Sequence, residues 1–242
     1  MNVLVTGAGL VGCNVAKLLQ ERGHAATLYD RSPNRPYIAS VAPGAGVVAG
    51  DVQDLAALIE TMQNATIDTV VHTAYLIGDA LNARPYAGVR ANVDGSLALF
   101  EAARLTGAKR FLFASTMGVY NWDALPQAPL TEDYPLAGDV FYLACKIASE
   151  RLLTAFANEY PIEFGILRLA QIYGRGHFAG GDYLGIALGG ALAAALAGKP
   201  VELDPGIVTL NDHVYAKDVA LGVVLACEKP LKHMVYNIGS GR

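Results

Sequence analysis

The chain has 242 residues, of which 53% are hydrophobic and 17% charged, and its formal net charge is −4. This composition predicts a large buried core, excludes extensive disorder, and argues against an electrostatic nucleic-acid binder, because such proteins present a basic face. The three cysteines, Cys13, Cys145 and Cys227, show no metal-ligand spacing, so we expect no bound metal and a reduced, cytoplasmic setting. The first residues lack the basic region of a signal peptide and are typical of a strand.

A strand, a glycine-rich turn and a helix are predicted at the start of the chain. Residues 2–6 are apolar and mostly branched, and Gly7, Gly9 and Gly12 follow in a G-x-G-x-x-G pattern. In this context the first glycine makes the turn, the second lets the backbone approach a pyrophosphate, and the third packs the helix on the strand. The amides at the helix start, at Leu10 and Val11, would then face the anion.

The next predicted strand, 25–30, ends at Asp30, eighteen residues after Gly12. A carboxylate at this position hydrogen-bonds the adenosine ribose hydroxyls and repels a 2′-phosphate, so the pattern favours NAD over NADP. Arg31 and Arg35 follow closely and would weaken that preference. We expect the proline-rich residues 31–46 to form a surface loop.

Strand and helix patterns alternate along most of the remaining chain, which predicts an α/β Rossmann-type fold, a doubly wound parallel sheet with helices on both faces. The longest apolar stretch, residues 183–198, falls short of the roughly 20 residues of a bilayer span, so we expect a buried helix and no membrane partner. The further predicted strands are 47–51, 68–74, 110–115 and 164–169, and the further predicted helices are 54–63, 91–106, 141–158, 185–197 and 216–228.

The predicted helix at 141–158 carries Tyr142 and Lys146 four residues apart, hence one turn apart on one face. A phenol has a pKa of about 10 and is a poor base at neutral pH. A neighbouring ammonium, together with a positively charged nicotinamide ring, would favour the phenolate and lower that pKa. The pair would form a proton shuttle for a secondary alcohol or ketone. His72 lies in an apolar strand and is expected to be a core histidine with satisfied hydrogen bonds.

Further motifs occur in order along the chain: residues 50–52 (GDV), 70–74 (VVHTA), 92–95 (NVDG), 115–120 (STMGVY), 167–168 (LR) and 236–239 (YNIG). Together with the glycine turn and the Tyr-Lys pair, they resemble the extended short-chain dehydrogenase/reductases, the NAD-dependent epimerase/dehydratase group. The resemblance runs from Val3 to Gly241. It is much more specific for the family than for one reaction.

The resemblance implies that Thr116, Tyr142 and Lys146 are catalytic. The Thr116 hydroxyl would hydrogen-bond the reacting oxygen, and Lys146 would also bind the nicotinamide ribose. Thr116 and Gln171 would contact the substrate. Arg175 is a further substrate candidate, because its charge suits an anionic substrate. A homodimer is also implied, with the helices at 91–106 and 141–158 packed against their symmetry mates. Beyond the glycine turn, Asp30 and the Tyr-Lys pair, the implied cofactor contacts are Asp51 at the adenine, Val52, Ala74, Asn92, Ser115 and Leu169.

Departures from the family pattern narrow the expected chemistry. Met117 and Gly118 stand where dehydratases of the group have Asp-Glu, so we do not expect dehydration. Gln171 replaces a common Asn, and Asn211 replaces an Arg that normally helps hold a diphosphate, which weakens the interpretation as a nucleotide-sugar enzyme. We predict an NAD-binding core over residues 1–170 and a reduced, interleaved substrate-binding part over residues 171–242.

The expected function is therefore that of an NAD-dependent oxidoreductase that interconverts a secondary alcohol and a ketone, with a sugar-like or small polar substrate. Two alternatives fit the same residues. One is an NAD-dependent sugar or nucleotide-sugar epimerase that works through a transient keto intermediate. The other is a non-catalytic NAD-binding sensor or scaffold.

Overall fold

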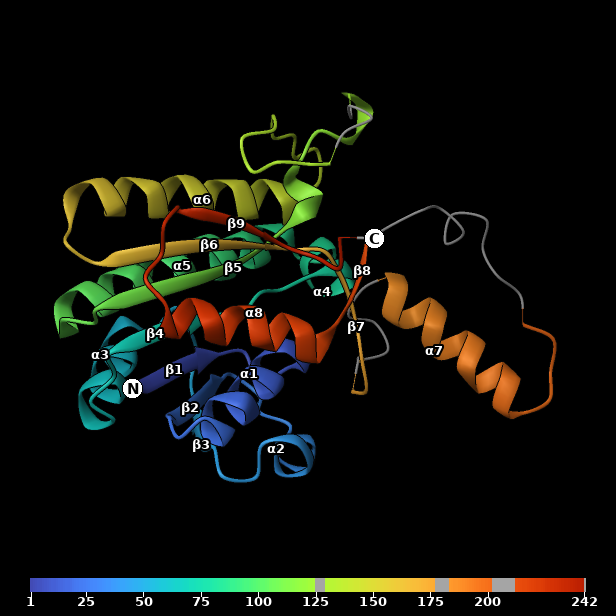
Figure 1. Cartoon of the computed structure of the whole chain (residues 1–242), viewed down its shortest axis with the longest axis horizontal. Coiled ribbons are helices and arrows are strands. Elements are labelled where there is room, and N and C mark those ends of the chain that lie inside the picture. Colours follow the sequence, from blue (N-terminus) through green and yellow to red (C-terminus); the bar gives the residue numbers. More distant parts are fainter. Residues whose placement is uncertain (125–128, 177–182, 202–211, 242) are drawn as a thin grey trace.

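The computed structural model describes residues 1–124, 129–176, 183–201 and 212–241, with no account of the side chains of residues 124 and 183–188. Seven parallel strands form one sheet in the order β3-β2-β1-β4-β5-β6-β9 (Figure 1). This arrangement confirms the predicted α/β Rossmann-type fold. The strands are β1 (Asn2–Thr6), β2 (Ala25–Asp30), β3 (Gly46–Ala49), β4 (Thr69–His72), β5 (Arg110–Thr116), β6 (Glu163–Leu169) and β9 (Val235–Ile238).

Helices cover both faces of the sheet and bury a separate apolar cluster on each. Side chains alternate across a strand, so Val3 and Val5 of β1 lie in one cluster and Leu4 lies in the other. Each fully buried side chain of this kind contributes about 1.5–3 kcal/mol. The first cluster is covered by α1 (Leu10–Glu21), α2 (Arg35–Val41) and α8 (Ala216–Glu228), and the second by α3 (Leu55–Asn64), α5 (Pro85–Thr106) and α6 (Phe141–Glu159).

The strand order reverses between β1 and β4, which positions the site. The chain runs outward from β1 through β2 to β3, and then returns to place β4 on the other side of β1. Thr6 pairs with His72 at the carboxyl ends of these two strands, and Thr116 pairs with Leu169 further along the same edge. In open parallel sheets, ligands bind at such a reversal, outside the carboxyl ends of the strands.

Several short elements were not predicted. Residues 31–46, expected as a loop, contain α2, because the Asn34 side chain accepts from Tyr37 N at 3.1 Å, Pro36 lies in the first turn, and Ile38 is buried. Two three-residue strands, β7 (Gln171–Tyr173) and β8 (His213–Tyr215), pair in parallel and form a second sheet. The helix α4 (Gly78–Asn82) and the 3₁₀ turns η1 (Met117–Val119) and η2 (Trp122–Ala124) are also among these short elements.

The prediction of a buried helix at 183–198 is wrong for the side chains that the structure describes. The helix α7 (Tyr183–Leu196) lies away from the seven-stranded sheet in Figure 1, and Leu192 and Leu196 are 62% and 81% exposed. An apolar sequence favours burial, but it does not encode which other segment would cover the helix. Within the described parts of the chain, no helix is long and apolar enough to cross a membrane.

Candidate active site

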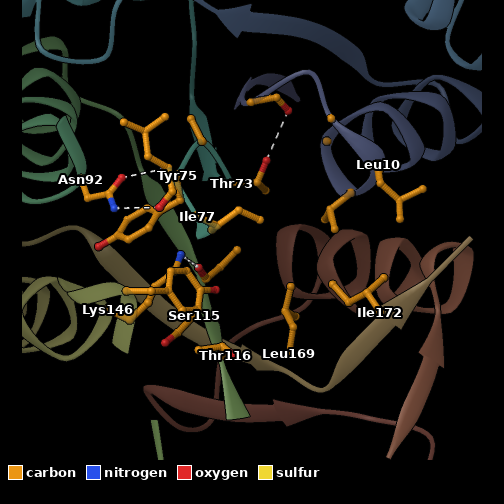
Figure 2. A pocket seen from close by; sticks show the side chains of 18 of the residues that line it. Leu10, Thr73, Tyr75, Ile77, Asn92, Ser115, Thr116, Lys146, Leu169 and Ile172 are labelled. Carbon is orange, nitrogen blue, oxygen red and sulfur yellow. Dashed lines mark hydrogen bonds between the residues drawn. The ribbon is translucent and has the colours of Figure 1, made fainter. Parts of the chain in front are cut away.

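A cleft of about 1140 Å³ opens at the carboxyl ends of the strands (Figure 2). It brings together every residue predicted to contact the cofactor, and also Thr116 and Gln171. Arg175 is not among the described residues that line it: the side chain is exposed, and the Arg175 carbonyl accepts from the Tyr37 hydroxyl at 3.3 Å. The predicted cofactor residues that line the cleft are Gly7, Gly9, Leu10, Val11, Gly12, Asp30, Asp51, Val52, Ala74, Asn92, Ser115, Tyr142, Lys146 and Leu169.

The glycine turn has no room for side chains. Gly7 has a φ of +87°, and a Cβ there would lie 2.7 Å from the Ala74 amide nitrogen. A Cβ on Gly12 would lie 1.9 Å from the Gly7 carbonyl oxygen, so the start of α1 packs directly on the turn. Gly9 caps α1, whose first turn holds no acidic residue. The first amides of a helix lack intrahelical partners, so this wall of the cleft can bind a pyrophosphate.

Asp30 is fixed at the far end of the cleft, where β2 ends. Its two carboxylate oxygens accept from Ala8 N at 2.8 Å and Ser32 N at 2.7 Å. Asp51 lies beside it, and its backbone carbonyl accepts from the buried Tyr29 hydroxyl at 3.1 Å. Arg31 also lines this end. A side-chain-free cradle with a carboxylate held beyond it fits a dinucleotide with a free 2′-hydroxyl, that is, NAD.

The catalytic candidates lie together on the other side of the cleft. Lys146 is only 3% exposed, and its Nζ donates to the Ala114 carbonyl at 2.6 Å (Figure 2). Burial lowers the pKa of Lys146 to about 7, although the negative charge of Glu150 opposes this shift. Thr116 accepts from Gly118 N at 3.1 Å through its hydroxyl oxygen, and the half-buried Tyr142 lines the same wall.

Ser115 is also a predicted cofactor residue, but its hydroxyl donates into the protein. The acceptor is Oε1 of Glu150, at 2.5 Å. Glu150 in turn forms a buried ion pair with Arg168, with Nη2 and Oε2 2.7 Å apart. Sequence analysis missed Glu150, although a charged residue one turn after Lys146 in a packed helix was a usable signal. The Ser115 hydroxyl is therefore used in this hydrogen-bond network, so a contact with the cofactor would have to come from the Ser115 backbone.

Hydrogen bonds hold the side chains of both His72 and Asn92. The two ring nitrogens of His72 lie 2.7 Å from the Thr6 hydroxyl and 3.0 Å from the Ser96 hydroxyl. Burial and the charge of Lys146 lower the pKa of His72 to about 3, so the expectation of a neutral, satisfied core histidine is confirmed. Asn92 binds both backbone groups of Leu76 and so fixes the segment that follows β4.

Other cleft residues were missed because nothing in the sequence marks them. Tyr75 follows β4 and lies beside Lys146. Trp122 and Val140 are 50% and 57% exposed where they line the mouth of the cleft. Asp212 precedes β8, and its carboxylate accepts from the backbone and hydroxyl of Ser240. These residues come from segments far apart in the chain.

The fold and the cleft together define a class of protein: a Rossmann-type dinucleotide-binding enzyme with Tyr142 and Lys146 in the same cleft as the glycine turn. Residues 3–239 match the sequence model of the NAD dependent epimerase/dehydratase family, and the chain belongs to this family. Its cofactor is NAD. Because the similar proteins are enzymes, membership also sets aside the non-catalytic sensor or scaffold.

Similar proteins carry out more than one net reaction. The whole chain is 29% identical to the UDP-glucose 4-epimerase of Corynebacterium glutamicum, of which it covers 76%. It is also 29% identical to the D-erythronate dehydrogenase of Cupriavidus necator, with 98% of this chain and 76% of that protein aligned. The structure of the UDP-glucose 4-epimerase of Thermotoga maritima with UDP-glucose matches with a TM-score of 0.88 at 28% identity, over all of this chain and 78% of that one. A Thermus thermophilus UDP-glucose 4-epimerase in complex with NAD matches with a TM-score of 0.86, at the same identity and coverage.

Proposed function

We propose that the protein is an NAD-dependent oxidoreductase that interconverts a secondary alcohol and a ketone, with Tyr142 as the proton-transfer residue. The observation that carries this proposal is the buried Lys146 ammonium, which lies one helical turn from Tyr142 on the wall that also holds Thr116. A cation held there favours the phenolate form of the tyrosine.

The residues divide the chemistry as follows. When bound, NAD supplies the hydride acceptor. Tyr142 takes the hydroxyl proton of the alcohol, while the Thr116 hydroxyl donates to the reacting oxygen and fixes its position. Lys146 stabilises the Tyr142 phenolate and binds the nicotinamide ribose. The glycine turn and Asp30 hold the rest of the dinucleotide.

The charges at the cleft support a substrate without a diphosphate. Among the described lining residues, the basic side chains are Arg31, beside Asp30, and Lys146, which is held on the Ala114 carbonyl. At the end of the cleft near β8, the described lining residues include the acidic side chain of Asp212. Outside the described parts, residues 125–128, 177–182 and 202–211 contain no Lys or Arg, and the one such residue is Arg242. Asn211 stands where the family pattern has Arg. Guanidinium groups are the usual partners of a diphosphate, so this cleft favours a small polar or sugar-like substrate.

Epimerisation is the second candidate, because UDP-glucose 4-epimerases match the whole chain in sequence and in structure. An epimerase oxidises and re-reduces one carbon, so the ketone must present both faces. The ketone would have to rotate within a cleft of about 1140 Å³ that also takes the cofactor. The two candidates share Tyr142, Lys146 and Thr116, and they differ in whether the cofactor leaves in reduced form.

The test begins with the cofactor. Freshly purified protein is denatured, and the NAD(H) and NADP(H) released per chain are quantified. Little bound nucleotide, together with accumulation of reduced cofactor when NAD and polyols are added, supports the oxidoreductase. Near-stoichiometric NAD and conversion of UDP-glucose without net reduction support the epimerase. Release of NADP would contradict the role given to Asp30.

We also propose a homodimer formed through α5 and α6, as the resemblance implies. Leu97 and Leu105 of α5 are 39% and 49% exposed, which supports a covered surface there. Size-exclusion chromatography with light scattering would measure the molecular mass. A monomer at micromolar concentration would contradict this proposal. The cytoplasmic setting stays a prediction; Cys13, Cys145 and Cys227 are free and buried.

A further inference from the structure

Tyr75 touches both members of the proton-transfer pair. The Lys146 Nζ lies 3.5 Å from the centroid of the Tyr75 ring, compared with 4.7 Å for the Phe113 ring and 5.8 Å for the Tyr142 ring. The same Tyr75 ring meets the Tyr142 ring edge to face, with centroids 6.1 Å apart and an interplanar angle of 81°. Figure 2 shows Tyr75 and Lys146 on the same wall of the cleft.

A chain of hydrogen-bonded hydroxyl groups holds the Tyr75 side chain at its hydroxyl end. Its hydroxyl lies 2.9 Å from the Ser149 hydroxyl, which donates to Ser96 at 3.3 Å, and Ser96 lies 3.0 Å from His72 Nε2. Burial raises the pKa of Tyr75 well above its usual value, so its hydroxyl stays protonated in the neutral range. The chain of hydroxyl groups therefore fixes the ring without giving it a charge.

The Tyr75 ring lies against the buried Lys146 ammonium. An ammonium has three hydrogens to donate, and the acceptor given by the structure is the Ala114 carbonyl on β5. A buried cation that has lost its hydration water is attracted electrostatically to the face of an aromatic ring. The oxygens of Glu150, which also favour the ammonium, are bound by Ser115 and Arg168. The titratable or charged groups around Lys146 are Tyr142, Cys145 and Glu150 on α6, His72 on β4, and Tyr75 after it.

We propose that Tyr75 is a positioning residue for proton transfer: the face of its ring holds the Lys146 ammonium in place and charged, and its contact with Tyr142 fixes that ring. The role rests on the proposed function of the Tyr-Lys pair. The aromatic ring is responsible for this role, and the hydroxyl group orients the ring. The VVHTA motif at residues 70–74 gives Tyr75 no role, because Tyr75 is the residue that follows it.

The test compares Tyr75→Leu, which removes the ring, with Tyr75→Phe, which keeps it. Without the ring the ammonium is less stable, so the phenolate of Tyr142 forms only at higher pH. We expect Tyr75→Leu to move the acid limb of the kcat/KM profile upward by about one pH unit, which is about a tenfold loss on that limb. Tyr75→Phe should restore the wild-type profile to within about a third of that shift.

A second readout does not need activity. In NAD-saturated protein, the phenolate absorbance of Tyr142 is titrated, with the corresponding Tyr142→Phe protein as the blank. The apparent pKa should rise by about one unit in Tyr75→Leu and stay near the wild-type value in Tyr75→Phe. If Tyr75→Leu does not fold, Tyr75→Met, which also lacks a ring, replaces it.

The outcomes separate the two proposals. If Tyr75→Leu shifts the Tyr142 titration but the wild-type protein transfers no hydride, the proposed function is wrong, while the effect of the Tyr75 ring on the Tyr142 pKa stands. Equal shifts in Tyr75→Phe and Tyr75→Leu would place the effect in the hydroxyl chain and overturn the proposal. Unchanged profiles in a folded, NAD-binding Tyr75→Leu would overturn it as well.

Discussion

Replacing Glu150 by Gln should destabilise the protein by about 3 kcal/mol. Glu150 and Arg168 have side chains only 4% and 5% exposed, and two Arg168 nitrogens reach the carboxylate at 2.7 and 3.1 Å. Removing one partner of a buried ion pair costs about 3–5 kcal/mol, because the other charge stays buried without compensation. The amide oxygen of Gln still accepts one hydrogen bond, so we take the lower end. For a chain of this length, the expected fall in Tm is roughly 6–12 °C.

Urea and thermal unfolding followed by circular dichroism would measure this change. The control is a double-mutant cycle with Arg168→Met, because removing Arg168 as well leaves no unpaired guanidinium in the core. The double variant should regain most of the stability that Glu150→Gln loses. A loss below about 1 kcal/mol in Glu150→Gln would refute the reasoning, since it would mean that the Arg168 charge is satisfied by Tyr120 and the Glu132 carbonyl alone.

Three further changes test the site. Gly12→Ala should abolish NAD binding, measured as loss of the NAD-induced rise in Tm, because a Cβ would lie 1.9 Å from the Gly7 carbonyl. Tyr142→Phe should lower turnover by about 10²–10⁴-fold while the Kd for NAD, from fluorescence titration, stays within a few-fold; unchanged turnover would exclude Tyr142 as the proton-transfer residue. Because burial lowers the pKa of Lys146 to about 7, the folded state binds fewer protons than the unfolded chain between pH 7 and about 10.4. The wild-type protein should therefore gain stability as the pH rises through this window, and in urea unfolding Lys146→Met should lack that gain.

The glycine turn and the strand that ends in Asp30 could be predicted because each is local. The turn is encoded by three glycines within six residues, and the carboxylate follows a short apolar run. The helix that pairs Tyr142 with Lys146 also follows from spacing alone. In each case the residues that define the feature are neighbours in sequence, so no distant contact is needed to interpret them.

Features that depend on distant partners could not be predicted in this way. The apolar pattern of α7 gives no information about what would cover it, and Leu196 is largely exposed. Arg175 looked suitable for an anion by charge, but its backbone is tied to α2. The Ser115 hydroxyl lies in a motif, yet it donates to Glu150 thirty-five residues away. Each of these features is set by tertiary contacts that spacing does not encode.

Glu150 affects both the stability of the protein and the pKa of Lys146, and the double-mutant cycle with Arg168→Met separates the two effects. Its carboxylate pairs with Arg168, and its charge also raises the pKa of Lys146 against the effect of burial. Removing that charge should therefore move the acid limb of activity upward, in the same direction as loss of the Tyr75 ring, because a less stable ammonium supports the Tyr142 phenolate less well. Arg168→Met cannot restore the missing negative charge. The double variant should thus regain stability while its pH profile stays shifted, and recovery of both would mean that the profile reports packing and not charge.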